Sequence, residues 1–249
     1  MLLEARGLVK HFGAMTATSS VSLAVKSGEV HAVIGPNGAG KTTLLAQLSG
    51  ELTPDEGAVF FEGRAITSLS VPRRAALGIG RVYQLTSIFP DYTVIENMLL
   101  AHYSTSGHSF RFLRGFGADA GARTHSLEVL DQVGLVERAS VAARALSHGE
   151  QRQLELAMML ALRPKLLLLD EPTAGMGIEE TERVVGLLSR LKGEVAMLLV
   201  EHDMDAVFEL ADRVTVLVYG RVIAEGGVDA IRRDPDVRRA YLGDEESGE

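Results

Sequence analysis

"GPNGAGKT", residues 35–42, is the segment from which the expected architecture of this chain can be derived. It matches G-x-x-x-x-G-K-[ST], the pattern of a loop whose glycines let backbone N–H groups wrap phosphate oxygens. EVHAVIG before it is predicted to be a short buried strand, and KTTLLAQLSG after it a helix that ends at glycine. In such a loop Lys41 reaches the β- and γ-phosphates, and the Thr42 hydroxyl can hold Mg²⁺. The alternative, a glycine-rich turn without a ligand, is disfavoured by this strand–loop–helix context.

A second strand-end motif is LLLLDE, residues 166–171. Four consecutive leucines predict a central parallel strand that is buried on both faces. Open α/β sheets bind ligands at the carboxyl ends of such strands. Asp170 can contribute to a Mg²⁺ shell there, and Glu171 can polarise an attacking water. An Asp-Glu pair alone could equally begin a solvated loop, but the phosphate loop in the same chain favours the functional interpretation.

The chain of 249 residues has room for one α/β domain with a subdomain. GAVFFEG (57–63) and GIGRVYQ (78–84) are predicted to be further strands. From residue 166 strands and helices alternate, and the series ends in a hairpin that turns at Gly220. This alternation predicts a parallel sheet covered by helices.

The middle of the chain, about residues 86–162, is predicted to be a mostly helical subdomain. It contains Ser104–Gly121, rich in Gly, Ser and Arg, which is either a flexible surface loop or a basic, Phe-bearing contact with a membrane partner or lipid headgroups. Residues 244–249 form an acidic tail that is expected to fray. Since no internal repeat or clear linker divides the chain, we expect a single domain over residues 1–249.

Composition excludes several classes of protein. The net charge of −8 and a pI of about 5.4 argue against a nucleic-acid partner, which usually binds a basic face. The absence of cysteine excludes disulfides, thiol catalysis and cysteine-ligated zinc. No run approaches the ~20 apolar residues of a membrane helix, and the N-terminus lacks a signal-peptide pattern. We therefore expect a soluble protein that reaches a membrane only through a partner.

The segment RALSHGEQRQLELAMMLALRP, residues 144–164, predicts a capped amphipathic helix. Ser147 and Glu150 fit the S-x-x-E capping box, and apolar residues follow at helical spacing until Pro164. Ser147 and His148 do not form a convincing nucleophile and base, because adjacent side chains on a helix do not face each other. A helix N-terminus does attract anions, so the segment could bind a phosphate.

Together these motifs resemble the nucleotide-binding subunits of ABC transporters over nearly the whole chain. The resemblance implies a P-loop NTPase with a mostly parallel core sheet, an N-terminal antiparallel β subdomain and a helical subdomain. It also implies that Glu171 is the catalytic glutamate, that His202 in VEHD is the switch histidine, and that Gln84 in VYQ couples the metal site to a membrane subunit. Without the resemblance, His202 and Gln84 would be ordinary strand-end residues.

ATP and Mg²⁺ are the cofactors that the resemblance implies. The implied nucleotide-binding residues are Phe12, Gly35, Asn37, Gly38, Gly40, Lys41, Thr42, Thr43, Ser147, Gly149 and Glu150. The implied metal-binding residues are Thr42, Gln84 and Asp170. Phe12 in LVKHFG occupies the place of the aromatic residue that stacks on adenine, and the less favoured alternative is a packed core residue.

In this family the signature helix presents its N-terminus to the γ-phosphate bound by a facing subunit. Ser147, Gly149 and Glu150 in LSHGEQ would then cap their helix and bind nucleotide across a dimer. Two positions depart from the family pattern. His148 replaces a glycine of the commonest signature, LSGGQ, and Gly177 stands where an aspartate commonly links the two sites. The second change weakens the expectation of tight coupling between sites, but not that of ATP binding.

EPTAGMG, EHDM, the middle insertion and the ending AYLG are similar to the ATP-binding subunits of branched-chain amino-acid importers. ATPases of urea/amide importers and of a lipopolysaccharide exporter are close alternatives. A non-transport ABC ATPase would usually carry two cassettes or a coiled-coil insertion. A P-loop kinase of a small metabolite would need an acceptor-binding lid, and it would leave the signature helix and His202 without a role.

The resemblance also implies partners and a location. We expect membrane permease subunits, a second ATP-binding subunit that is identical or different, and indirectly a solute-binding protein. We expect no nucleic acid. The chain should be cytoplasmic and held at the inner face of the cell membrane by its permease subunits.

Overall fold

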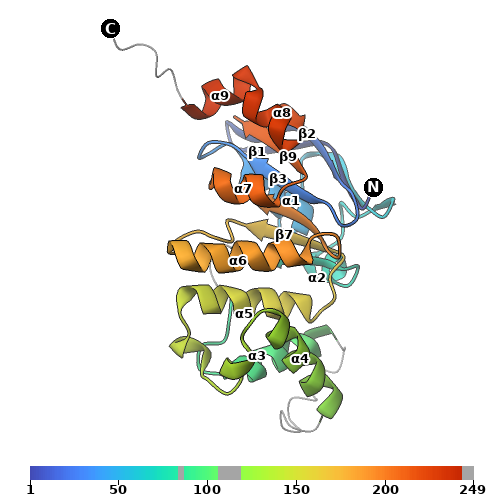
Figure 1. Cartoon of the computed structure of the whole chain (residues 1–249). Helices are drawn as coiled ribbons and strands as arrows, with labels where there is room; N and C mark the ends of the chain where they lie inside the picture. The colour runs from blue at the N-terminus through green and yellow to red at the C-terminus, as the bar shows by residue number, and fades with distance from the viewer. Residues whose placement is uncertain (84–86, 106–118, 243–249) are drawn as a thin grey trace.

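The computed structural model describes residues 1–83, 87–105 and 119–242, and within them the strands form two sheets (Figure 1). A four-stranded antiparallel sheet has the order β2-β1-β4-β5, and a six-stranded sheet has the order β10-β9-β3-β8-β7-β6. The strands are β1 Leu3–Phe12, β2 Met15–Val25, β3 Val30–Ile34, β4 Glu56–Phe61, β5 Arg64–Ala65, β6 Ile79–Val82, β7 Leu166–Asp170, β8 Ala196–Val200, β9 Arg213–Val218 and β10 Arg221–Gly226.

The larger sheet is parallel except for β10, which pairs with β9 as an antiparallel hairpin. The predicted α/β fold, with a mostly parallel core and an antiparallel β sheet from the N-terminal part, is therefore confirmed. Strands β3, β8 and β7 are direct neighbours in the larger sheet. Their carboxyl ends lie at one edge of the sheet, so the loops after them come together there.

The four leucines of strand β7 pack into two hydrophobic cores, one on each face of the larger sheet. Leu167 and Leu169 belong to the core on the side of the helices, whereas Leu166 and Leu168 belong to the core shared with α1 and the antiparallel sheet. All four are fully buried, as a period of two along a doubly covered strand requires. Each such leucine contributes about 1.5–3 kcal/mol of burial free energy.

Helices cover both faces of the larger sheet. They are α1 Lys41–Ser49, α2 Val71–Ala75, α3 Val94–Thr105, α4 Ala120–Gln132, α5 His148–Leu160, α6 Ile178–Leu191, α7 Met204–Leu210, α8 Val228–Arg233 and α9 Pro235–Leu242, with short 3-10 turns η2 Val136–Arg138 and η3 Ala143–Ala145. The predicted helices at α1, α5, α6 and α7 are present. Helices α2, α8 and α9 were not predicted, because five to eight residues are too few for a clear apolar period.

In Figure 1, helices α3, α4 and α5 gather at one end of the molecule, while α8 and α9 lie at the opposite end. The separation of the first group as a subdomain over about residues 86–162 stays a prediction. Gln84, most of the 104–121 segment and the 244–249 tail lie outside the described residues. Among the helices of the described ranges, none combines the length and the apolar character needed to cross a bilayer.

Candidate functional site

The phosphate loop joins β3 to α1, and two of its glycines are required by close backbone approaches. A Cβ at Gly35 would lie 2.0 Å from the carbonyl oxygen of Leu217, and one at Gly40 would lie 2.1 Å from that of Ala17. Gly38 and Gly40 have φ angles of 78° and 100°, which are unfavourable for any residue that has a Cβ atom. The loop is therefore held against the neighbouring hairpins in a conformation that only glycine permits.

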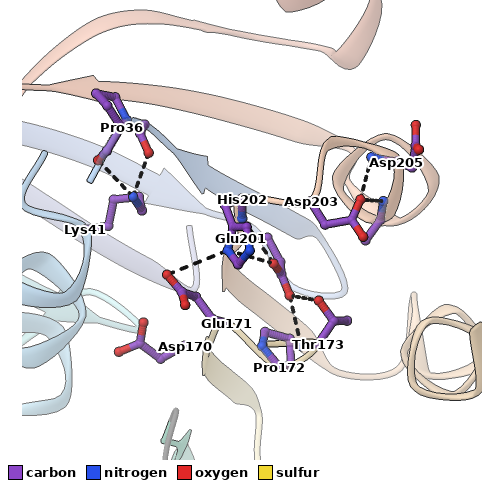
Figure 2. Close-up of polar contacts among 12 residues, drawn as sticks. Pro36, Lys41, Asp170, Glu171, Pro172, Thr173, Glu201, His202, Asp203 and Asp205 are labelled. Atoms are coloured by element: carbon purple, nitrogen blue, oxygen red, sulfur yellow. Dashed lines mark hydrogen bonds and ion pairs between the residues drawn. The ribbon is translucent and has the colours of Figure 1, made fainter. Parts of the chain in front are cut away.

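Lys41 begins α1 and folds back over this loop. Its Nζ donates to the carbonyl oxygens of Gly35, at 2.6 Å, and Pro36, at 3.1 Å (Figure 2). Burial lowers the pKa of the Lys41 ammonium, and the nearby charges of Glu171 and Asp170 oppose that shift. The ammonium group is thus kept at the loop by carbonyl acceptors that a phosphate could replace.

A cavity of about 380 Å³ opens on this loop. It is lined by residues 37–43 of the loop and α1, by Glu171, and by Met15, Thr16, Ala17 and Tyr219 from two hairpins. Among the predicted site residues it therefore brings together Asn37, Gly38, Gly40, Lys41, Thr42, Thr43 and Glu171. Its walls offer backbone N–H groups, the ammonium of Lys41 and the hydroxyls of Thr16, Thr42, Thr43 and Tyr219, which suit a polyphosphate.

Asp170 ends β7 next to this cavity with its side chain only 6% exposed. Its Oδ2 lies 3.2 Å from a guanidinium nitrogen of Arg81 on β6, and Arg81 is also bound by Glu51. Burial raises the pKa of Asp170, while the Arg81 guanidinium is the main influence that lowers it. Arg81 therefore offsets the cost of holding an acidic side chain inside the sheet.

Glu171 follows Asp170 in a left-handed conformation with a φ of 46°. Such a φ is unfavourable for a residue with a Cβ, and the Glu171 N–H donates to the carbonyl oxygen of Val200 on β8 at 2.9 Å. This bond fixes the turn that directs the carboxylate toward His202. The Glu171 Oε1 lies 3.9 Å from Nδ1 of His202, whose side chain is 61% exposed (Figure 2).

Glu201 links the two loops that carry Glu171 and His202 through hydrogen bonds. Its carboxylate is fully buried and accepts from the N–H and the hydroxyl of Thr173 after β7 (Figure 2). It also accepts from the N–H of His202, at 3.1 Å. Asp203 then caps α7 through the N–H groups of Asp205 and Ala206. The histidine is consequently held between a buried carboxylate and a capped helix.

Arg152 connects helix α5 to the same strand ends. Its guanidinium is 4% exposed and donates to the carbonyl oxygens of Asp170 and Pro172, at 3.1 and 3.2 Å. It also donates to the carbonyl oxygen of Tyr83, directly before Gln84, and to Glu155, whose pKa is raised by burial. One buried side chain therefore ties the signature helix to the strand ends of β6 and β7.

The signature segment lies away from the cavity. Ser147 and Glu150 form the predicted capping box at the start of α5, so this part of the prediction is confirmed. The second oxygen of Glu150 pairs with Arg138 at 2.9 Å. Gly149 donates its N–H to Glu180 of α6 at 3.2 Å. Within the described part of the chain, Ser147, Gly149 and Glu150 do not line the phosphate-loop cavity.

Two other predicted residues fall outside this assembly. Gln84 is not among the described residues, so its coupling and metal roles stay predictions. Phe12 ends β1, is 46% exposed and pairs in register with Met15, which lines the cavity while Phe12 does not. Its exposure makes it available to a ligand, and argues against the packed-core alternative.

Four charged residues of this assembly were not predicted from the sequence: Arg81, Arg152, Glu180 and Glu201. A faint signal existed for two of them, because Arg152 interrupts the apolar face of α5 and Glu201 directly follows a fully apolar strand. Buried charges usually have partners, which makes such positions informative. The partners themselves could not be named, because they lie on other elements.

The oxygen donors present fit Mg²⁺, a hard cation that takes oxygen ligands. They are the Thr42 hydroxyl in the cavity and the Asp170 carboxylate beside it. No group of three or more His, Cys, Asp or Glu residues able to hold a metal occurs in residues 1–83, 87–105 and 119–242. A Mg²⁺ ion held by these two oxygens would take its other ligands from water or from a bound phosphate.

Two known family profiles match this chain. The sequence profile of the "ABC transporter" family matches residues 18–174, and that of the "Branched-chain amino acid ATP-binding cassette transporter" matches residues 221–247. The chain is also 36% identical over 255 residues to the high-affinity branched-chain amino acid transport ATP-binding protein BraF of Pseudomonas aeruginosa, with 98% of each chain covered.

Two solved structures are similar as well. The ADP conformation of MJ1267, an ATP-binding cassette of an ABC transporter, has a TM-score of 0.87 at 30% identity, over 97% of this chain and 98% of that one. The dimeric structure of MJ0796, a bacterial ABC transporter cassette, has a TM-score of 0.77 at 26% identity, over 91% of this chain and 98% of that one.

Proposed function

The chain belongs to the ABC transporter family of ATP-binding cassettes, and we propose that it is the ATP-hydrolysing subunit of an importer of branched-chain amino acids. The observation that carries the cargo class is similarity to BraF over 98% of both chains, including a C-terminal segment matched by the branched-chain profile. ATPases of urea/amide importers and lipopolysaccharide exporters are the alternatives, because the chemistry of the phosphate-loop cavity concerns the nucleotide and does not distinguish between cargoes.

The phosphate loop and its neighbours bind ATP in this proposal. Backbone N–H groups of residues 37–43 surround the β- and γ-phosphates, and Lys41 exchanges its carbonyl acceptors for phosphate oxygens. Thr42, Asp170 and Gln84 are the residues that would hold Mg²⁺, which neutralises charge on those oxygens. The exposed ring of Phe12 stacks on the adenine.

Hydrolysis then depends on the ends of β7 and β8. The Glu171 carboxylate faces the cavity and accepts the proton of the attacking water. His202, whose Nδ1 lies 3.9 Å from that carboxylate, orients the reacting groups. Lys41 stabilises the charge that develops on the transferred phosphoryl group.

The site is completed by a second cassette. Ser147 and the N–H groups at the start of α5 bind the γ-phosphate held by the facing subunit, since they lie outside the cavity of their own chain. Glu150 is an acceptor-only group occupied by Ser147 and Arg138, so it acts through the helix cap. The dimeric MJ0796 cassette supports such pairing.

Permease subunits anchor the paired cassettes to the inner face of the membrane in this proposal, and a solute-binding protein delivers the cargo. The test is purification of the tagged chain from its own membranes in mild detergent, with partners identified by mass spectrometry. We expect permease subunits, a second ATPase and a solute-binding protein that binds leucine, isoleucine or valine. Recovery of soluble proteins alone would contradict the transport function, and a binding protein selective for urea or amides would contradict the cargo.

A further inference from the structure

Two helix N-termini that are distant in sequence share one carboxylate. Glu180 is the third residue of α6, and its Oε1 accepts the N–H of Gly149 in the first turn of α5 at 3.2 Å. Glu180 therefore connects the first turn of its own helix to the first turn of the signature helix.

The contact with Gly149 is close along the whole side chain. A Cβ added at Gly149 would lie 2.9 Å from Cγ of Glu180 and 3.0 Å from its Cβ and Cδ. The side chain thus lies flat against the first turn of α5, with its carboxylate at the N–H groups. This is the place where the partial positive charge of a helix attracts an anion.

The surrounding hydrogen-bond donors and a nearby positive charge stabilise the ionised form of Glu180. The Ser147 hydroxyl, followed by the Gly149 N–H, holds the pKa of Glu180 below its usual range. Arg183, one turn later on α6, adds a smaller attraction. The neighbouring acid Glu150 is already bound to Arg138 and to the N–H of Ser147, so it does not compete for the Gly149 N–H.

We propose that Glu180 occupies the phosphate position of the signature helix in the free chain and must withdraw before the γ-phosphate of a facing cassette can bind there. The inference rests on the proposed function, because it concerns regulation of the same composite site. Ser147 and Gly149 are the groups that the carboxylate and the incoming phosphate would share.

Withdrawal of the Glu180 carboxylate leaves the signature helix capped. When the carboxylate leaves Gly149, a contact between α5 and α6 is lost, while Ser147 and Glu150 still form the capping box of α5. In the free chain, the Glu180 carboxylate places a negative charge at the N-terminus of α5, where the γ-phosphate of a facing cassette would bind. Two anions at one helix N-terminus repel each other, so a cassette that brings ATP must displace this charge.

The test compares dimer dissociation constants by analytical ultracentrifugation with ATP and Mg²⁺, in the hydrolysis-blocked Glu171→Gln background. Addition of Glu180→Gln removes the charge and keeps an acceptor for Gly149. We expect the dimer to become at least about tenfold tighter. Glu180→Ala should tighten it as well. A merely structural role would instead make the alanine variant weaker and the glutamine variant neutral.

The matched control is Glu179→Gln, which changes the net charge equally on an exposed neighbour in the same helical turn. It should leave the dimer constant unchanged. Equal constants with and without Glu180→Gln would overturn the role of Glu180 and leave the composite site standing. Absence of an ATP-dependent dimer in every variant would overturn both the composite site of paired copies and this inference.

Discussion

The phosphate-loop edge and the signature segment are two half-sites built in opposite ways. At the first, Lys41 is 6% exposed, Glu201 is fully buried, and buried charges meet partners from three neighbouring strands. At the second, Ser147 and His148 are exposed, and the groups that could bind an anion are bound by the chain's own Glu150 and Glu180. The first half-site is assembled from the chain's own strand ends, whereas under the proposed function the second is completed by a facing subunit.

Arg152 connects the signature helix to the phosphate-loop edge of the larger sheet. It lies on the signature helix, yet it donates to carbonyl oxygens of residues 170 and 172 at the end of β7. Arg152 therefore links the helix that carries the signature segment to the backbone beside Glu171.

The largest effect should come from breaking the first half-site. Lys41→Ala removes the ammonium that phosphate oxygens would bind, at about 1.5–3 kcal/mol for each charge-assisted hydrogen bond. With two such bonds we expect ATP affinity, measured by isothermal titration calorimetry, to fall about 100-fold or more. Lys165→Ala, an exposed lysine paired with Glu62, is the control. Unchanged ATP affinity of the Lys41 variant would remove the phosphate-loop assignment.

Breaking the second half-site should separate binding from turnover. Ser147→Arg places bulk where the facing γ-phosphate docks, so we expect ATP hydrolysis to fall about 100-fold through misplacement of the reacting groups. ATP affinity should not change, because Ser147 lies outside the cavity of its own chain. Ser70→Arg, at the exposed N-cap of α2, introduces the same side chain elsewhere. Full turnover in the Ser147 variant would show that one chain suffices.

A smaller change should separate catalysis from binding within the first half-site. Glu201→Gln puts an amide N–H₂ against donors of Thr173 or His202, a mismatch of about 1–3 kcal/mol. We expect turnover to fall about tenfold at unchanged ATP affinity, since the hydrogen bonds of Glu201 go to Thr173 and His202 rather than to the phosphate loop. Thr173→Ser keeps both donors and serves as the control in steady-state ATPase assays. Equal loss of affinity and turnover would assign Glu201 to general stability.

Much of both half-sites could be predicted, because their signals are local. The phosphate loop, the leucine strand and the capping box each depend on residues a few positions apart, and the structure has all three elements where they were expected. Helices α2, α8 and α9 were not predicted, because they are too short to show a clear apolar period. Gly177 and His148 could be recognised as departures from a family pattern, but their conformations and contacts could not be predicted from the sequence.

Local sequence was sufficient to define which segments become buried strands, where the phosphate loop lies and how α5 begins, because backbone conformation and periodicity act over short distances. Tertiary packing was needed to establish that Glu201 binds Thr173, 28 residues away, that Arg152 reaches β7, and that Glu180 reaches Gly149 across 31 residues. The physical reason is that strand order and helix packing choose the partner of a buried charge, and that choice leaves no periodic trace in the chain.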